Sequence, residues 1–486
     1  MNFRTILTTA SVLCCAVSAW PAEDQVPQLQ RQLQQLQAEF EKTRLEQQQQ
    51  IDALTRQLAT LANAPAPAAA PVPAPADDQQ KLERELAAAT EPPVAPPGTA
   101  PRSPPPLAGA HAGSAYMNIS FGSLLAAGWS SAANPSAQLE LGDHDPIKRG
   151  FALRNAEISL DGAIDPYFKG FANIVLKLDK NNATEIELEE SYLQSTSLPA
   201  NLQLKAGQYF ASFGRQNPQH PHTWAFVDQP LILGRAFGPD GLRGIGTQLS
   251  WLAPTPFYTE LFLSVLDGQG GTAFSFRNPG DPDAAGVPRY AGRATLDRTL
   301  RGPQDLLLVP RLASSFELSD SQTLLAGASA ALGPNDTGPQ RRTEVYGVDL
   351  FWKWKPADAA QGFPYVSWQT EALYRRFAAG ADPLVALPAA TLRDYGYYTQ
   401  LVWGFVPRWN TGLRLDYTAG NDAATEAGDP YRGQRYRFSP ELTFLPSEFS
   451  KVRLQYNYDH GDLFGTAHSI WMQLEFGLGA HAAHKY

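Results

Sequence analysis

Polar and apolar residues alternate in sixteen short segments between Ala115 and the C-terminus, and the connectors between these segments are alternately tight and long. In the last segment the apolar face carries Ile470, Met472, Leu474, Phe476 and Leu478, and the opposite face carries Ser469, Gln473 and Glu475. A barrel that crosses a membrane requires this pattern, because each strand presents one face to lipid and the other to a lumen. The alternation therefore predicts an all-β fold, a 16-stranded antiparallel transmembrane β-barrel. The alternative is a soluble β-sandwich, whose strands also alternate.

The predicted strands are separated by tight turns such as Asp165-Pro166 and by long connectors, notably 126–150, 214–240, 268–305 and 378–393. By residue number the strands are 116–125, 151–164, 167–179, 186–196, 201–213, 241–253, 257–267, 306–318, 322–332, 342–355, 365–377, 394–406, 408–419, 435–445, 450–460 and 467–478. An even strand number with both ends on the periplasmic side is typical of bacterial barrels. In this arrangement the connector 214–240 is the third external loop.

The N-terminal residues predict where the barrel is located. Residues 1–19 carry Arg4, an apolar run and the small-residue end Val17-Ser18-Ala19, which is the pattern of a secretory signal peptide. Both cysteines, Cys14 and Cys15, lie within this segment. The sequence has no apolar run long enough for a membrane-spanning helix. The export signal, the absence of cysteine after this signal and the barrel pattern together predict the bacterial outer membrane as the location.

Two further segments precede the predicted barrel. In residues 24–63 leucines such as Leu29, Leu33 and Leu36 recur at heptad spacing, which predicts a periplasmic coiled coil that oligomerises the protein. A single solvated amphipathic helix is the alternative. Residues 64–114 are rich in proline and alanine, as expected for an extended linker. The barrel is then expected to occupy residues 115–486.

Motifs for enzymatic chemistry are absent from the sequence. It contains no G-x-S-x-G nucleophile elbow, no phosphate-binding glycine loop and no H-E-x-x-H zinc helix. Histidine pairs occur at His220/His222 and His481/His484, but two ligands make a weak metal site. We therefore expect no enzymatic activity, no cofactor and no metal. The formal net charge of −9 provides no basic surface for nucleic acid.

The stretch 205–251 reads as a strand, a long loop and a returning strand, and it carries the most specific motifs. Its distinctive residues are Gly207, Gln208, Phe213, Asp228, Arg235, Ala236, Phe237, Pro239, Arg243 and Gly246. Together with the segment 189–193 (Glu-Glu-Ser-Tyr-Leu), this pattern resembles the phosphate-selective porin O/P family of outer-membrane porins. The resemblance implies a trimer of sixteen-stranded barrels, an arginine-lined, anion-selective lumen, and a third loop that folds into this lumen.

The same resemblance implies that the third loop forms the constriction of the pore. Its candidate residues are Arg215, His220, His222, Asp228, Arg235, Asp240 and Arg243. By strand parity, the residues expected to line the lumen include Lys169, Lys205, Arg311, Arg414, Arg437, Arg453, Glu157 and Glu189. Opposed charges of both signs weaken the field that selects anions, so phosphate specificity does not follow from the fold.

The sequence as a whole is best interpreted as an outer-membrane porin that forms a water-filled channel for passive diffusion of small solutes. The resemblance implies anionic, phosphate-like solutes. The expected partners are outer-membrane lipid, small solutes and two further copies of the chain, joined through the barrel and the coiled coil. The alternatives are a plugless nutrient- or metal-regulated receptor-like barrel, and a structural barrel that anchors the periplasmic coiled coil.

Overall fold

A computed structural model describes residues 109–112, 115–163, 165–296, 299–420, 433–462 and 464–479. The predicted signal peptide 1–19 and coiled coil 24–63 lie outside the described residues, as does the predicted linker 64–114 apart from residues 109–112. These residues form a short strand, β1 (Gly109–Ala112), which pairs with the beginning of β2. No helix in the described part of the chain has the length and apolar character that a membrane crossing requires.

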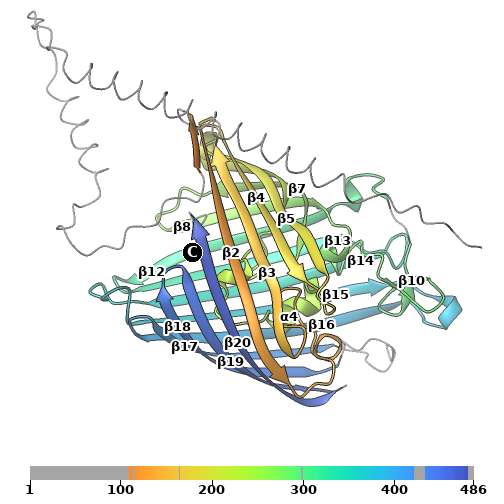
Figure 1. Ribbon diagram of the computed structural model, residues 1–486. Helices are drawn as coiled ribbons and strands as arrows, with labels where there is room; N and C mark the ends of the chain where they lie inside the picture. The colour runs from red at the N-terminus through yellow and green to blue at the C-terminus, as the bar shows by residue number, and fades with distance from the viewer. Residues whose placement is uncertain are drawn as a thin grey trace, which may run out of the picture. The chain divides into compact units, whose positions relative to one another are not determined.

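The described chain forms a closed antiparallel β-barrel (Figure 1). Its sixteen strands are β2 (Ala115–Ser130), β3 (Gly150–Ala163), β4 (Phe168–Leu178), β5 (Thr184–Ser195), β6 (Leu202–Phe210), β7 (Arg243–Leu252), β8 (Tyr258–Asp267), β12 (Leu307–Ser319), β13 (Gln322–Pro334), β14 (Arg342–Trp354), β15 (Tyr365–Ala379), β16 (Ala390–Val406), β17 (Trp409–Gly420), β18 (Arg435–Ser447), β19 (Ser450–Gly461) and β20 (Gly465–Gly479). Residues 120–130 of β2 pair with residues 469–479 of β20, which joins the two ends of the sheet. The predicted fold class is therefore confirmed.

The two faces of each strand have opposite environments. In β20 the side chain of Met472 is 51% exposed on the outer face, whereas its neighbour Gln473 is 5% exposed on the inner face. The two faces of the last strand are therefore assigned correctly by the sequence, since Ile470, Leu474 and Leu478 are exposed on the outer face as well. An apolar outer face suits lipid, and a closed sheet leaves no backbone group without a partner in the hydrocarbon region.

Strand ends differ from the prediction most at β2, which continues to Ser130 instead of ending at residue 125. Its last residues include Ala126, Ala127 and Gly128, which are all small and so show no polar alternation. Residues 126–128 nevertheless pair with β3 on one side and β20 on the other. Neighbouring strands therefore define this end of β2, and the pattern of its own side chains does not.

The long connectors contain elements that the sequence did not predict. The first external loop carries a short helix, α3 (Pro135–Gln138), and the third carries α4 (Leu231–Phe237). The connector between β8 and β12 forms a small three-stranded sheet of β9 (Asp281–Pro282), β10 (Pro288–Tyr290) and β11 (Arg293–Ala294). These pieces are too short for sequence periodicity to reveal them.

The parity of β20 leads to a test of the membrane-facing surface. Met472→Arg places a charge near the middle of this strand on the lipid side, which should lower the free energy of unfolding by about 2–4 kcal/mol. Leu478→Arg makes the same change on the same face close to the strand end, where the cost falls to about 0–1 kcal/mol. Urea unfolding in lipid vesicles measures both values. Equal losses for the two variants would contradict the assigned membrane position.

Candidate functional site

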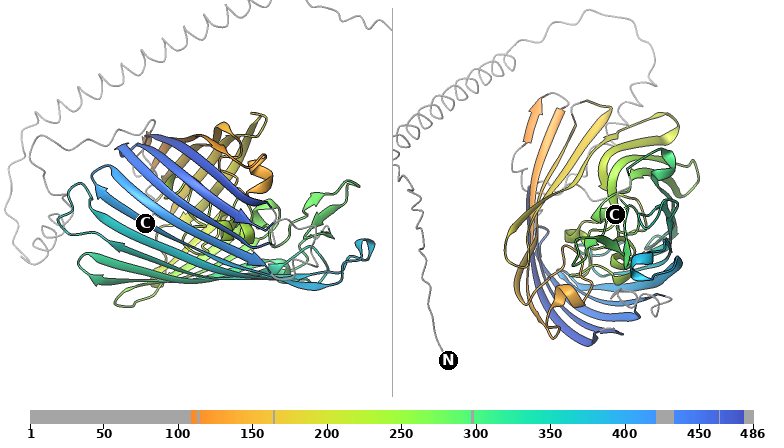
Figure 2. Two further views of the ribbon diagram at one scale, coloured as in Figure 1. Left: turned by 90° about the horizontal axis from the view of Figure 1, so that it is seen from below. Right: turned by 90° about the vertical axis from the view of Figure 1, so that its right-hand side faces the viewer.

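The third external loop, which in the structure comprises residues 211–242 between β6 and β7, lies inside the barrel and reaches the wall opposite its own strands (Figure 2). Its helix α4 contacts β15, β16 and β17, although the loop begins at β6 and ends at β7. The backbone N–H of Leu231 donates to Asp416 on β17 at 3.0 Å, and that of Val227 donates to Gln455 on β19 at 2.7 Å. The loop thus crosses the lumen, as the resemblance implied.

One side chain joins the two ends of this loop. The amide Nδ2 of Asn217 donates to the carbonyl oxygens of Ala211 and Leu242, at 2.9 and 3.0 Å. Its Oδ1 accepts from the backbone N–H of Leu242 at 2.7 Å. Buried backbone groups need partners, and this single asparagine supplies three. The loop is closed at its base before it enters the lumen.

Asp228 anchors the third loop to the wall formed by β17 and β18. Its two carboxylate oxygens accept from Arg414 at 2.6 Å and from Arg437 at 2.8 Å. Gln455 and Asn457 donate to the same carboxylate at 2.8 and 2.6 Å. Burial alone would raise the pKa of Asp228, but Arg414 and Arg437 hold it well below its usual range. The carboxylate is therefore ionised and fully hydrogen-bonded.

Helix α4 links the third loop to the first. Arg235 on α4 donates to both carboxylate oxygens of Glu140, at 3.0 and 3.1 Å. Arg435 on β18 also donates to Glu140, at 2.9 Å. Nearby, the backbone N–H of Gln229 donates to Asp145 of the first loop at 3.0 Å. Two loops, and not one, therefore fill this part of the lumen.

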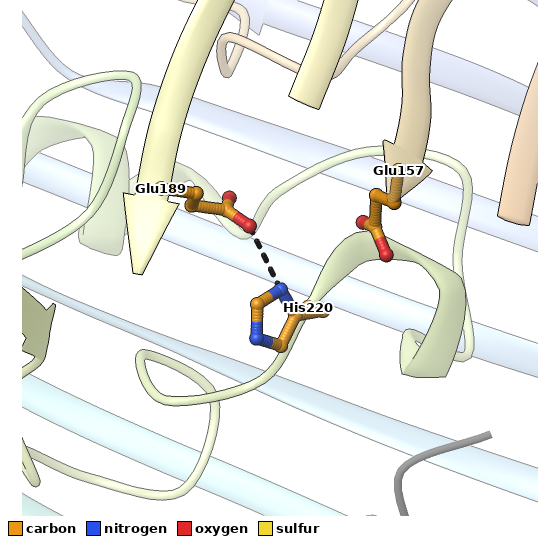
Figure 3. A group of neighbouring side chains, drawn as sticks. All are labelled: Glu157, Glu189 and His220. Carbon is orange, nitrogen blue, oxygen red and sulfur yellow. Dashed lines mark ion pairs between the residues drawn. The ribbon is translucent and has the colours of Figure 1, made fainter. Parts of the chain in front are cut away.

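On the side facing β3 and β5, the third loop places His220 and His222 beside buried glutamates of these strands; Figure 3 shows His220 with Glu157 and Glu189. His220 Nδ1 lies 2.8 Å from Glu189 Oε2, and its Nε2 lies 2.9 Å from Glu190 Oε2. His222 Nδ1 lies 2.9 Å from Glu157 Oε2, and the two imidazole rings stack with centroids 5.8 Å apart. All three glutamates are buried.

A β-bulge makes this cluster possible. In the β4–β5 ladder Asn173 pairs with Glu190 and Ile174 pairs with Leu188, so Glu189 is the extra residue. Successive residues of a regular strand point to opposite faces, whereas a bulge breaks this alternation. Both Glu189 and Glu190 therefore point into the barrel, with exposures of 1% and 7%.

A second group of charges surrounds the end of the loop. Arg243 forms an ion pair with Glu187, which also pairs with Lys177 at 2.9 Å. Asp240 lies nearby, and its pKa is raised to about 7 by burial and by the negative charge of Asp143. Asp143 in turn pairs with Lys177. This group alternates cations and carboxylates, so its charges compensate one another.

His144 connects the first loop to the histidine–glutamate cluster. Its Nε2 lies 3.3 Å from Glu189 Oε1, and its Nδ1 lies 3.1 Å from the carbonyl oxygen of Arg154. Burial lowers the pKa of an imidazole, but the adjacent Glu189 carboxylate outweighs burial here and raises the pKa of His144 to about 9. The first loop thus contributes a positive charge to a wall that is otherwise rich in carboxylates.

Arg215 differs from Arg235, the other arginine of the third loop. Its Nε donates to the amide of Gln369 at 3.2 Å, and its guanidinium lies 3.8 Å above the ring of Phe351. The backbone N–H groups of Arg215 and Gln216 donate to Glu371 at 3.2 and 2.7 Å. The side chain is half-buried, and its hydrogen bond goes to a neutral amide.

The structure places all seven candidate constriction residues in or beside the third loop within the lumen. Of the predicted lining residues, Arg311, Arg414, Arg437, Arg453, Glu157 and Glu189 are buried on the inner face. Lys205 lies half-buried with its ammonium 4.4 Å from the ring of Tyr192, and Lys169 is exposed near its strand end. Whether these residues control permeation stays a prediction.

Sequence reasoning missed several residues of the site. Glu190 was assigned to no site because strand parity directs it outward, and only a bulge signal could have corrected this. Glu140 and His144 belong to the first long connector, for which the sequence predicts an external position. Asn217 stands in a polar run, Gln216 to Gln219, where nothing marks it out.

Asp228 provides a test of how the loop is held. Asp228→Asn removes the carboxylate between two buried arginines, although Asp416 and Asp459 still pair with one arginine each. We expect a loss of about 3 kcal/mol in the free energy of unfolding and faster proteolytic cleavage within the third loop. The control is Asp283→Asn, which removes a half-buried ion pair with Arg289 in another loop and should leave both readouts unchanged. If both variants behave alike, Asp228 is not an anchor.

Comparison with known proteins identifies a related sequence and a solved structure with a similar fold. No family model matches the chain. An uncharacterized protein of Aquifex aeolicus (strain VF5) is 32% identical over 356 residues, which cover 70% of this chain and 71% of that protein.

Among solved structures, the outer membrane channel DcaP of Acinetobacter baumannii matches 76% of this chain and 100% of its own, with a TM-score of 0.50 and 13% identity. An anion-selective porin from Comamonas acidovorans matches 75% of this chain and 100% of its own, with a TM-score of 0.46 and 6% identity. The likeness to DcaP concerns the fold alone. The chain belongs to the same family as the Aquifex aeolicus protein.

Proposed function

We propose that this protein is an outer-membrane porin, a channel through which small solutes diffuse passively. The observation that carries the proposal is the third loop, which crosses the inside of a barrel whose outer face is apolar and whose inner face is charged. A sixteen-stranded barrel is wide enough for an aqueous channel, and a loop inside it narrows the path. Width and lining charge then select the solute.

The charges of the lumen support weak selection. Glutamates of β3 and β5 face the third loop on one side, and arginines of β17, β18 and β19 face it on the other. Most of these groups form ion pairs, and paired charges contribute little net field. Arg215 donates to an amide, and the side chain of Lys353 is exposed, so these two cations add a positive bias. We therefore propose small anions, phosphate-like ones among them, as the preferred solutes.

The proposal includes the assembly and its location. The signal peptide 1–19 directs export to the outer membrane, and the barrel together with the coiled coil 24–63 forms a homotrimer. The apolar outer face supports a contact with lipid or with another barrel, and the heptad spacing supports helix association. The linker 64–114 spans between these two parts.

Conductance across a planar lipid bilayer tests the proposal. The purified full-length protein should produce stepwise, ohmic currents in potassium chloride, since an open aqueous path conducts ions. A structural barrel that anchors the coiled coil, or a receptor-like barrel, does not need to conduct. Absence of current from correctly folded protein would therefore overturn the porin function.

The charge bias leads to a separate prediction. Arg215→Gln removes a cation whose charge no hydrogen-bonded carboxylate balances, so the reversal potential in unequal potassium chloride should shift toward cations. The matched control is Arg342→Gln, at the exposed end of β14, where the guanidinium donates to the backbone of Gln304. The control should leave the reversal potential unchanged. Equal shifts in both variants would mean that the third loop does not control selectivity.

A further inference from the structure

We propose that Glu157, Glu189 and His220 bind a divalent transition-metal ion, with zinc as the best match. These three residues come from β3, from the bulge of β5 and from the third loop, and all are buried (Figure 3). The sequence indicates only the His220/His222 pair, with no carboxylates beside it. The proposal is independent of whether the barrel conducts.

The spacing of the ligand atoms supports a metal site. One ligand atom from each of the three residues lies within 4.8 Å of the other two. Zinc binds carboxylate oxygen and imidazole nitrogen at roughly 2.0–2.2 Å in tetrahedral geometry, so its ligand atoms are separated by about 3.3–3.6 Å. The three groups therefore need side-chain rotation to reach this spacing. Glu189 Oε2 and His220 Nδ1 are already 2.8 Å apart.

The surroundings orient the ligands as they do in known metal sites. A metal-binding histidine usually donates its other ring N–H to a carboxylate, and ligating carboxylates are themselves hydrogen-bonded. Here His220 Nε2 lies 2.9 Å from Glu190, which leaves Nδ1 directed at Glu189. The amide of Asn155 donates to Glu157 at 2.6 Å, and that of Asn173 donates to Glu189 at 2.7 Å.

Two further imidazoles lie beside these ligands and can complete the coordination once the metal displaces their ring protons. His222 Nδ1 lies 2.9 Å from Glu157 Oε2, and His144 Nε2 lies 3.3 Å from Glu189 Oε1. Oxygen and imidazole nitrogen without thiolate is a ligand set that zinc accepts, and it disfavours ions that prefer sulfur. A bound ion takes the place of the ring proton between His220 and Glu189.

A second group of carboxylates in the lumen does not qualify. Asp143, Glu187 and Asp240 also lie close enough to share an ion. Lys177 and Arg243, however, already form ion pairs with members of this group. Ammonium and guanidinium groups supply the positive charge that a metal would bring, so this group is a network of ion pairs.

A metal at this position would fix the third loop to the wall of the barrel formed by β3 and β5. His220 belongs to the loop, whereas Glu157 and Glu189 belong to the wall. Asp228 fixes the same loop to the opposite wall through Arg414 and Arg437. The loop would then be attached on both sides of the lumen.

Metal binding to the full-length protein in detergent tests the proposal. The chain is freed of metal with a chelator, dialysed against zinc and analysed for bound zinc by mass spectrometry. His481→Gln and His484→Gln are introduced in every sample so that the C-terminal histidines do not contribute. We expect one zinc ion per chain. Cobalt in place of zinc should give the visible absorption bands of a low-symmetry site with nitrogen and oxygen ligands.

Substitutions at the proposed ligands test whether zinc binds at this position. His220→Gln and Glu189→Gln should each abolish stoichiometric binding, and Glu190→Gln should weaken it by about 10- to 100-fold through loss of orientation. The control is His468→Gln, an exposed histidine whose ring contacts Tyr456, which should bind zinc as the parent does. Heat-modifiable migration on gels verifies that each variant is folded.

Two outcomes would overturn the site. One is a parent protein that holds no zinc and gives no cobalt bands at micromolar metal. The other is undiminished binding in His220→Gln. If His220→Gln fails to fold, Glu190→Gln decides, because it removes only the partner of Nε2: unchanged affinity there contradicts the proposal.

Discussion

Most of this structure follows from one requirement: inside a lipid bilayer, every backbone N–H and C=O group needs a hydrogen-bond partner within the protein. A strand edge left open in the hydrocarbon region is costly, so the sheet must close, and here β2 and β20 close it. Closure directs alternate side chains of all strands inward. The apolar residues that lipid requires then face outward, and the buried charged residues of the strands face the lumen.

Charges confined in a lumen need partners of their own, because burial of an isolated charge is unfavourable. The strands supply some pairs directly, such as Arg311 with Asp349. The loops supply the others. Glu140 of the first loop and Asp228 of the third bring carboxylates to the arginines of β17 and β18, and His220 brings an imidazole to the glutamates of β5. Electrostatic compensation therefore explains why these two loops fold inward.

Much of this architecture could be predicted from sequence, because alternation is a local property. The strand positions and the parity of β20 follow from it, and the third loop was identified by its motifs. The partners in the lumen could not be predicted. Asp228 is more than 180 residues from Arg414 in sequence, and no periodicity relates them. The bulge that turns Glu190 inward was missed because a single inserted residue reverses parity without changing composition.

The pairing of β2 with β20 also bears on how the chain folds. Ser130 and Ser469 are opposite each other in the closing ladder, so the last contact joins segments separated by almost the whole barrel sequence. Contacts between distant segments must overcome a large loss of chain entropy before they contribute stability, and this slows folding. Until β20 inserts, β2 and β19 both present unpaired edges to other chains. The barrel therefore depends on protection of these edges during assembly, for as long as its final strand is missing.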